Sequence, residues 1–127
     1  MAQVDKSTHA GSAIVANRIK GDGTAPKYAH WGTGTTGAVV GDTALETARA
    51  ESRVAGTETI VTTTQTNDTY QVVSTLTCAG TPAAITEYGQ FDASVAGNML
   101  IRSTFDAINL QVGDSIQFTS KFKLAAT

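Results

Sequence analysis

The sequence contains one glycine-rich motif of a kind that can bind phosphate. Gly32-Thr-Gly34-Thr-Thr-Gly37 matches G-x-G-x-x-G, in which backbone amides approach a pyrophosphate. That function also requires a parallel strand before the motif, a helix opening at its third glycine and an acidic residue about twenty positions later. Here Gly41 follows soon after Gly37, and the chain continues into antiparallel hairpins. We therefore interpret the motif as a loop whose glycines permit turns with positive φ, and we expect no nucleotide cofactor.

The other reactive side chains are scattered and do not form a catalytic set. Cys78 is the single cysteine and ends an apolar strand, so we expect a buried, inert thiol. His9 has no Cys or second His nearby, and His30 beside an aromatic residue is typical of a hydrogen-bonded structural histidine. The sequence shows no paired carboxylates, no Ser/His/Asp set and no cluster of metal ligands. We expect neither an enzyme nor a metal or cofactor site.

The segment 42–53 carries the highest density of charge. Its acidic side chains could act as acid or base, but no histidine or second carboxylate in an apolar pocket is tied to them. We expect Asp42 to cap a short turn with Leu45 under the core, and the later charges to form a strip facing solvent or another subunit. The charged residues of that strip are Glu46, Arg49, Glu51 and Arg53.

Length and composition limit the functional classes. A chain of 127 residues is one domain that can bury a core without metal or disulfide. Charged residues make up 16%, below the roughly 25% of soluble domains. Such a surface fits a protein covered by other protein, or simply a threonine-rich β protein. The net charge of −2 comes without a basic run, which argues against nucleic-acid binding.

Nothing in the sequence indicates export or membrane insertion. The N-terminal residues lack the basic-then-apolar order of a signal peptide. No apolar run approaches the roughly 18 residues that a membrane span requires. We expect a soluble chain that is synthesised in the cytoplasm and has no membrane partner.

The elements that must position these residues are β-strands. Thr57 to Cys78 contains two runs rich in β-branched and aromatic residues on either side of Asn67-Asp68, which predicts a hairpin. Further strands are predicted over Lys27–Trp31, Ala84–Phe91, Met99–Phe105, Ile108–Val112 and Ser115–Leu124. About seven or eight strands without a long amphipathic helix predict an all-β fold, an antiparallel β-sandwich or jelly roll.

Residues 1–26 differ from the domain predicted over residues 27–127. They are polar and interrupted by glycines, and only Ala13 to Ile19 could form a short strand or a helical turn. A segment so poor in apolar residues cannot close a core alone. It is either a frayed tail or an extended N-terminal arm that lies on a neighbouring subunit. For the arm, Ile14, Val15 and Ile19 are the candidate anchors.

Residues 27–124 resemble small structural proteins of tailed bacteriophages. The motifs that carry the resemblance are, in order, Lys27-Tyr28, Trp31 to Gly37, Val40 to Leu45 with Arg49 and Arg53, Asn67 to Tyr70, Ile85 to Asp92, Asn98 to Leu100 with Phe105, and Gly113 to Ile116. Such proteins are described as tail-fibre-related or as capsid cement or decoration proteins. The cement proteins are compact jelly rolls that bind the shell as dimers or trimers. The resemblance implies no catalytic residues.

The lack of repeats or a shaft segment favours a cement protein over a tail fibre. The expected partners are the major capsid protein and further copies of the chain, as homodimer or homotrimer, on the exterior of a virion assembled in a bacterial host. Candidate contact residues are the arm anchors together with Trp31, Arg49 and Arg53, because Trp and Arg are favoured at interfaces. Trp31 could equally be a core residue.

The alternative is a tail-fibre or tail-tip component that binds a receptor or carbohydrate. β-Sandwiches bind such ligands through exposed aromatic residues and Asp or Asn in loops. In this sequence Tyr88, Asp92 and Asn98 are the candidates for that role.

Overall fold

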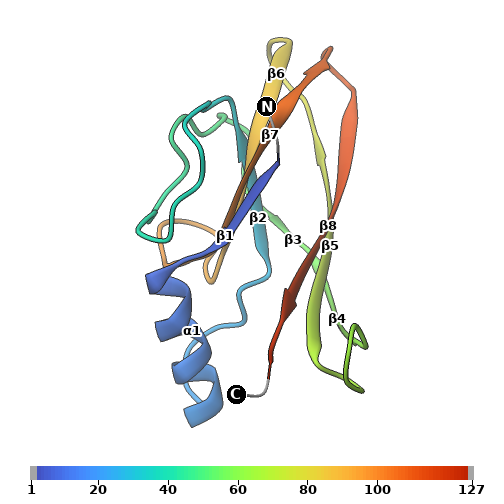
Figure 1. Ribbon diagram of the computed structural model, residues 1–127. Coiled ribbons are helices and arrows are strands. Elements are labelled where there is room, and N and C mark those ends of the chain that lie inside the picture. Colours follow the sequence, from blue (N-terminus) through green and yellow to red (C-terminus); the bar gives the residue numbers. More distant parts are fainter. Residues whose placement is uncertain (1–2, 126–127) are drawn as a thin grey trace.

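The computed structural model describes residues 3–125 and shows a mostly β chain with two antiparallel sheets and one helix (Figure 1). The larger sheet has the strand order β1-β7-β6-β2-β3, and the smaller has β4-β5-β8. The elements are β1 Val4–Ser7, α1 His9–Lys20, β2 Tyr28–Gly32, β3 Val54–Ala55, β4 Thr57–Val61, β5 Thr69–Thr77, β6 Ala83–Phe91, β7 Met99–Leu110 and β8 Ser115–Lys123. The expected all-β class is confirmed.

Side chains of both sheets share the larger of two apolar clusters. Phe118 of β8 is central to it, with its ring centroid 4.7 Å from that of Tyr88 and 6.4 Å from that of Trp31. The alternation predicted along β5 holds, because Val72 and Leu76 point into the core while Thr75 and Thr77 are exposed. The buried members of this core are Ala29, Trp31, Leu76, Cys78, Ile85, Tyr88 and Leu110.

The predicted hairpin forms, but its connection is longer than the two residues expected. Strands β4 and β5 pair antiparallel from Thr57↔Val73 to Val61↔Thr69, and residues 62–68 lie between them. The Asp68 carboxylate organises this loop by accepting hydrogen bonds from the amides of Thr63 (2.9 Å) and Gln65 (2.9 Å). The turn signal at Asn67, where φ is 59°, thus marks the end of a larger loop.

The two strands expected over Met99–Phe105 and Ile108–Val112 are one strand, β7. It pairs with β6 on one side and with β1 on part of the other. The register between β6 and β7 shifts between Ile85 and Glu87. This irregularity lies opposite the point in β7 where the sequence predicted a break between two strands, and the strand continues through it.

The N-terminal segment is folded onto the larger sheet and does not form an extended arm. Val4–Ser7 pairs with β7, in register from Val4↔Thr104 to Ser7↔Ile101. The helix α1 then lies against the same strand, where Ile14 packs on Leu100 and Ile101. A neighbouring element of the same chain supplies the apolar surface that we expected from another subunit.

Candidate functional site

Three of the six candidate contact residues meet at one apolar groove beside α1. Ile14, Val15 and Ile19 line it from the helix, and its volume is about 320 Å³. The floor and the opposite wall come from β7, β5 and the end of β8. We call this the α1 groove; its lining is Ile14, Val15, Arg18, Ile19, Ala25, Pro26, Glu58, Tyr70, Leu100, Phe122 and Leu124.

Hydrogen bonds at its first turn fix α1 over β7. Thr8 is the N-cap, and its Oγ1 accepts a hydrogen bond from the Gly11 amide at 2.9 Å. The same hydroxyl donates to the carbonyl of Met99 at 2.6 Å, and the Thr8 amide donates to the carbonyl of Leu100. A Cβ at Gly11 would lie 2.8 Å from the Leu100 carbonyl oxygen, so this close approach requires glycine.

The exposed wall of the α1 groove is apolar. Ile19 is 82% exposed on the helix and Leu124 is 56% exposed beyond β8, whereas Ile14 beneath them is buried. Isolated exposed apolar residues are normal on a protein surface, but these two line one groove. The groove is thus open to solvent where Ile19 and Leu124 line it.

The polar groups of the groove lie at its rim and floor. Glu58 pairs with Lys27 at 3.7 Å, and Arg18 donates to the carbonyl of Gly23 at 2.8 Å. The Tyr70 hydroxyl is buried and has no hydrogen-bond partner among residues 3–125. Burial raises the pKa of Tyr70, and the nearby charge of Glu58 adds to that effect. The groove therefore holds a buried hydroxyl close to the Glu58 carboxylate.

Trp31 and Arg49 lie away from this groove and are held inside the chain. Trp31 is fully buried, and its Nε1 donates to Glu51 at 2.9 Å. Arg49 pairs with the same carboxylate at 2.9 Å and also donates to the carbonyls of Ala79 and Thr81. Burial opposes ionisation of Glu51, but hydrogen bonds from Arg49 and Trp31 outweigh it and lower the pKa of this carboxyl. Trp31 is therefore a core residue, which was the alternative to a contact residue.

Arg53 is likewise used within the chain. Its guanidinium carbon lies 3.6 Å from the centroid of the Phe91 ring, a cation–π contact. Its Nη1 donates to the carbonyls of Ala93 (2.8 Å) and Ala96 (2.6 Å). The two arginines of the charged strip expected over 46–53 therefore make contacts within the chain. Arg49 binds the connection between β5 and β6, and Arg53 binds the connection between β6 and β7.

The residues considered for carbohydrate binding do not form an exposed cluster. Tyr88 is buried in the core, and its hydroxyl donates to Gln90 at 3.0 Å. The Asp92 carboxylate accepts the amide of Asn98 at 2.7 Å and so closes its own loop. An aromatic platform for a sugar requires an exposed ring, and Tyr88 does not supply one.

A buried ionic cluster on the larger sheet was missed by the sequence analysis. Glu87 of β6 is fully buried, and its Oε1 accepts hydrogen bonds from Nε (3.0 Å) and Nη2 (2.9 Å) of Arg102 on β7. Arg102 Nη1 also pairs with Asp42 at 3.0 Å. Burial opposes the charge of Arg102, but the hydrogen bonds that it donates to Glu87 and Asp42 prevail and raise its pKa. The usable signal was a charged residue in the middle of each of two apolar strands.

The glycine-rich motif contacts this ionic cluster, and the anion that its backbone binds is the Glu87 carboxylate of the same chain. The amides of Gly34 and Thr47 donate to Glu87 Oε2 at 2.9 and 2.8 Å, and the amide of Glu46 donates to Oε1. Glu46 Oε1 in turn accepts hydrogen bonds from the amides of Thr35 and Thr36. Hydrogen bonding by the Thr36 side chain and by these two amides lowers the pKa of Glu46. The amides of Gly34, Thr35 and Thr36 are thus already paired with carboxylates of the same chain, which occupy the place that a phosphate would take.

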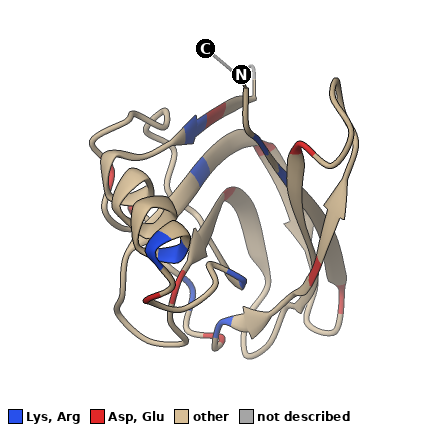
Figure 2. Ribbon diagram, turned by 90° about the horizontal axis from the view of Figure 1, so that it is seen from below, with Lys and Arg blue, Asp and Glu red and all other residues tan. Residues whose placement is uncertain are grey.

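His30 and Cys78 have structural surroundings. The His30 ring nitrogen Nε2 lies 2.8 Å from the carbonyl oxygen of Glu51, and Cys78 is buried. Among residues 3–125 no group of three or more His, Cys, Asp or Glu side chains is arranged to hold a metal ion. No helix in the same range is long and apolar enough to cross a membrane. Figure 2 shows Lys and Arg spread over strands, loops and α1 without a continuous basic stripe.

Comparison with known proteins gives no relative. No family model matches the chain, and neither the curated proteins nor the solved structures contain a significant match.

Proposed function

We propose that this chain is a capsid cement protein that binds the assembled shell of major capsid protein in a tailed bacteriophage and stabilises it. The sequence resemblance over residues 27–124 suggests the setting. The observation that carries the proposal is the α1 groove, where exposed Ile19 and Leu124 flank an apolar depression. A groove of this shape fits a small apolar anchor from a neighbouring protein.

The proposed mechanism is stabilisation by mass action. A protein that binds only the assembled, expanded shell lowers the free energy of that state. Covering a side chain such as Ile19 contributes about 1.5–3 kcal/mol at each contact. Because a shell offers many equivalent contacts, modest affinity at each one is sufficient.

We also propose that the two facing sheets form a β-sandwich of the jelly-roll type, as expected for such proteins. The shared core between the sheets supports this. Further support comes from the chain at Gly56, which passes from β3 of the larger sheet to β4 of the smaller.

The test is binding of the purified chain to shells that lack it. Ile19→Asp places a charge in the groove, and we expect it to weaken shell binding about tenfold or more. Val95→Asp is the matched control, because Val95 is 80% exposed in the 92–98 loop and does not line the groove. Unchanged binding of the Ile19 variant, or equal loss in both variants, would contradict the groove as the contact.

A point substitution is preferable to deletion of residues 1–26. Deletion would remove β1 and uncover Leu100, so a loss of binding would not separate contact from folding. The tail-fibre alternative predicts that neither variant binds shells and that the chain is found at the tail.

A further inference from the structure

Strand β8 is a free edge of the smaller sheet. All nine of its residues, Ser115–Lys123, pair with β5, and no strand of residues 3–125 pairs with its other side. An open edge presents unpaired amides and carbonyls to any second strand. Proteins blunt such edges with proline, bulges or charges, especially lysine. Strand β8 has no proline and its register is uninterrupted, and its two lysines, Lys121 and Lys123, both lie in its C-terminal half.

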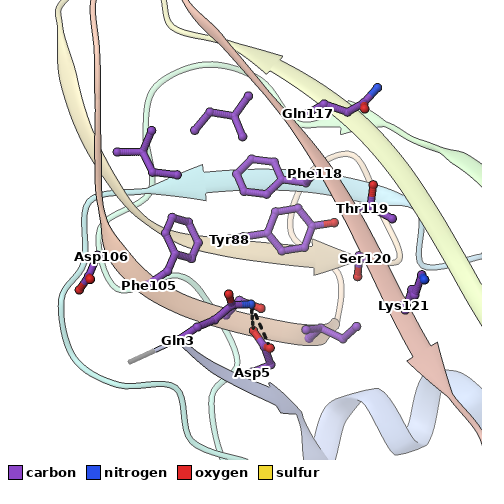
Figure 3. Close-up of a pocket in the computed structure, with 14 residues that line it drawn as sticks. Gln3, Asp5, Tyr88, Phe105, Asp106, Gln117, Phe118, Thr119, Ser120 and Lys121 are labelled. Atoms are coloured by element: carbon purple, nitrogen blue, oxygen red, sulfur yellow. Dashed lines mark hydrogen bonds between the residues drawn. The ribbon is translucent and has the colours of Figure 1, made fainter. Parts of the chain in front are cut away.

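An open cleft lies between this edge and the larger sheet. Its volume is about 580 Å³, and it is lined by β8 on one side and by β7 and β1 on the other. Figure 3 shows the rings of Tyr88, Phe105 and Phe118 gathered inside it, with the centroids of Phe105 and Phe118 6.2 Å apart. The inward residues of β8, which include Ile116 and Phe118, are only half-buried. The core is therefore incompletely covered along this edge.

We propose that a second copy of this chain covers the edge, with β8 pairing antiparallel to β8 of the partner about a twofold axis through Thr119. This is the register that pairs all nine residues of each strand. It places Phe122 opposite Ile116 and Phe118 opposite Ser120 on the inward face. The smaller sheets then form one continuous sheet, and both open clefts lie on the same side of it.

The charge pattern of β8 selects the antiparallel arrangement. Both lysines lie in the C-terminal half, and the neutral residues Ser115 and Gln117 share their face in the N-terminal half. In the antiparallel register Lys121 lies opposite Gln117, and Lys123 lies opposite Ser115. In-register parallel pairing would place each lysine beside its own copy, which is unfavourable because like charges opposite one another repel. The proposal concerns the chain by itself and does not depend on the capsid function.

The test measures the dimer dissociation constant of the full chain by analytical ultracentrifugation. Gln117 is exposed and lies opposite Lys121 twice in each dimer. We expect Gln117→Glu to tighten the dimer and Gln117→Lys to weaken it, each by roughly two- to thirty-fold, since two cross-strand charge pairs change. Adding Lys121→Glu to Gln117→Lys restores attraction and should recover the dimer.

Thr57 provides the matched control, because it lies exposed on β4 at the other edge of the same sheet. Thr57→Glu and Thr57→Lys should leave the dissociation constant unchanged. A dimer indifferent to charge at Gln117, one that responds to Thr57 instead, or a chain that stays monomeric at every concentration would overturn the proposal. Monomers whose β8 amides become protected from hydrogen exchange only on shells would assign the edge to capsid protein, and would also overturn it.

Discussion

Glu87 carries a charge at a position where a buried strand usually has an apolar side chain. Its carboxylate is satisfied by Arg102 from the neighbouring strand and by the amides of Gly34, Glu46 and Thr47 from the loop that covers it. Desolvating a carboxylate is costly unless its hydrogen-bonding capacity is filled, and here it is filled. The cluster therefore fixes the loop between β2 and β3 on the outer face of the larger sheet.

Removing that charge should destabilise the fold. Glu87→Gln leaves Arg102 buried with only Asp42 as an ionic partner, and breaking a buried pair costs about 3–5 kcal/mol. We expect a loss of this size in the free energy of unfolding measured with denaturant. Glu46→Gln is the control, since that carboxylate is exposed and accepts two loop amides; its effect should be much smaller. Equal losses in both variants would show that the buried pair has no special weight.

Single residues were the scale at which sequence reasoning was weakest. The glycines at 32–37 correctly indicated a loop, but none of them has the positive φ that we expected. Gly34 instead permits a close approach, because a Cβ there would collide with the side chains of Glu46 and Glu87. The anion that this loop holds comes from a residue more than fifty positions away. Arg49 and Arg53 looked like surface charges because pattern alone does not show what lies across a strand connection. Exposure at Ile19 and burial at Trp31 likewise depend on tertiary contacts that periodicity does not encode.

At the scale of elements, the longer strands after residue 27 were predictable, whereas β1 and β3 were not expected, and only a short strand or a helical turn was expected where α1 forms. The period-2 alternation of β5 and β8 follows directly from burial of one face, and both strands formed as expected. The helix α1 has a weak amphipathic pattern that includes Gly11 and Ser12, so its stability comes from its cap and from β7. The length of the β4–β5 loop was not predicted. It depends on hydrogen bonds from several backbone amides to the Asp68 carboxylate, and backbone hydrogen bonds leave no pattern in the sequence.

The close packing of α1 on β7 gives a test at Gly11. Replacing glycine by alanine within a helix is usually stabilising by about 0.5–1 kcal/mol. At Gly11 the new methyl group would lie 2.8 Å from a backbone oxygen, so we expect Gly11→Ala to destabilise the protein by about 1–3 kcal/mol. Ser12→Ala, on the exposed side of the same turn, should be neutral or slightly stabilising. A stabilised Gly11 variant in thermal unfolding would contradict this packing.

The Asp68 loop gives a test of pH dependence. Amide hydrogen bonds from Gln65, Thr63 and Thr64 hold the pKa of Asp68 well below its usual value. A carboxyl with a lowered folded pKa stabilises the fold above its unfolded pKa of about 3.9, and this contribution is lost as the pH falls towards the folded pKa. Asp68→Asn should therefore be less stable than the wild type at neutral pH. We expect the difference in unfolding free energy to shrink below about pH 4, and a constant difference would refute the assignment.

At the scale of the whole molecule, the two sides of the paired sheets differ. On one side the chain passes from the larger sheet to the smaller at Gly56, so the edge strands β3 and β4 are directly connected. On the other side β8 and part of β7 leave a cleft open. Composition and turn spacing predicted two sheets of antiparallel strands, but they did not predict which edges stay free. Strand β1 pairs with β7 only from Ile101 to Thr104, and β8 ends the smaller sheet of the described residues.

Electron microscopy of virions tests most directly whether the chain binds the capsid shell, as we propose. Virions should be imaged with and without this protein, or with the chain carrying a bound label. We predict density at regular, symmetry-related positions on the outer surface of the shell, absent when the protein is absent. Density confined to the tail, or a shell that looks the same in both samples, would contradict the proposal.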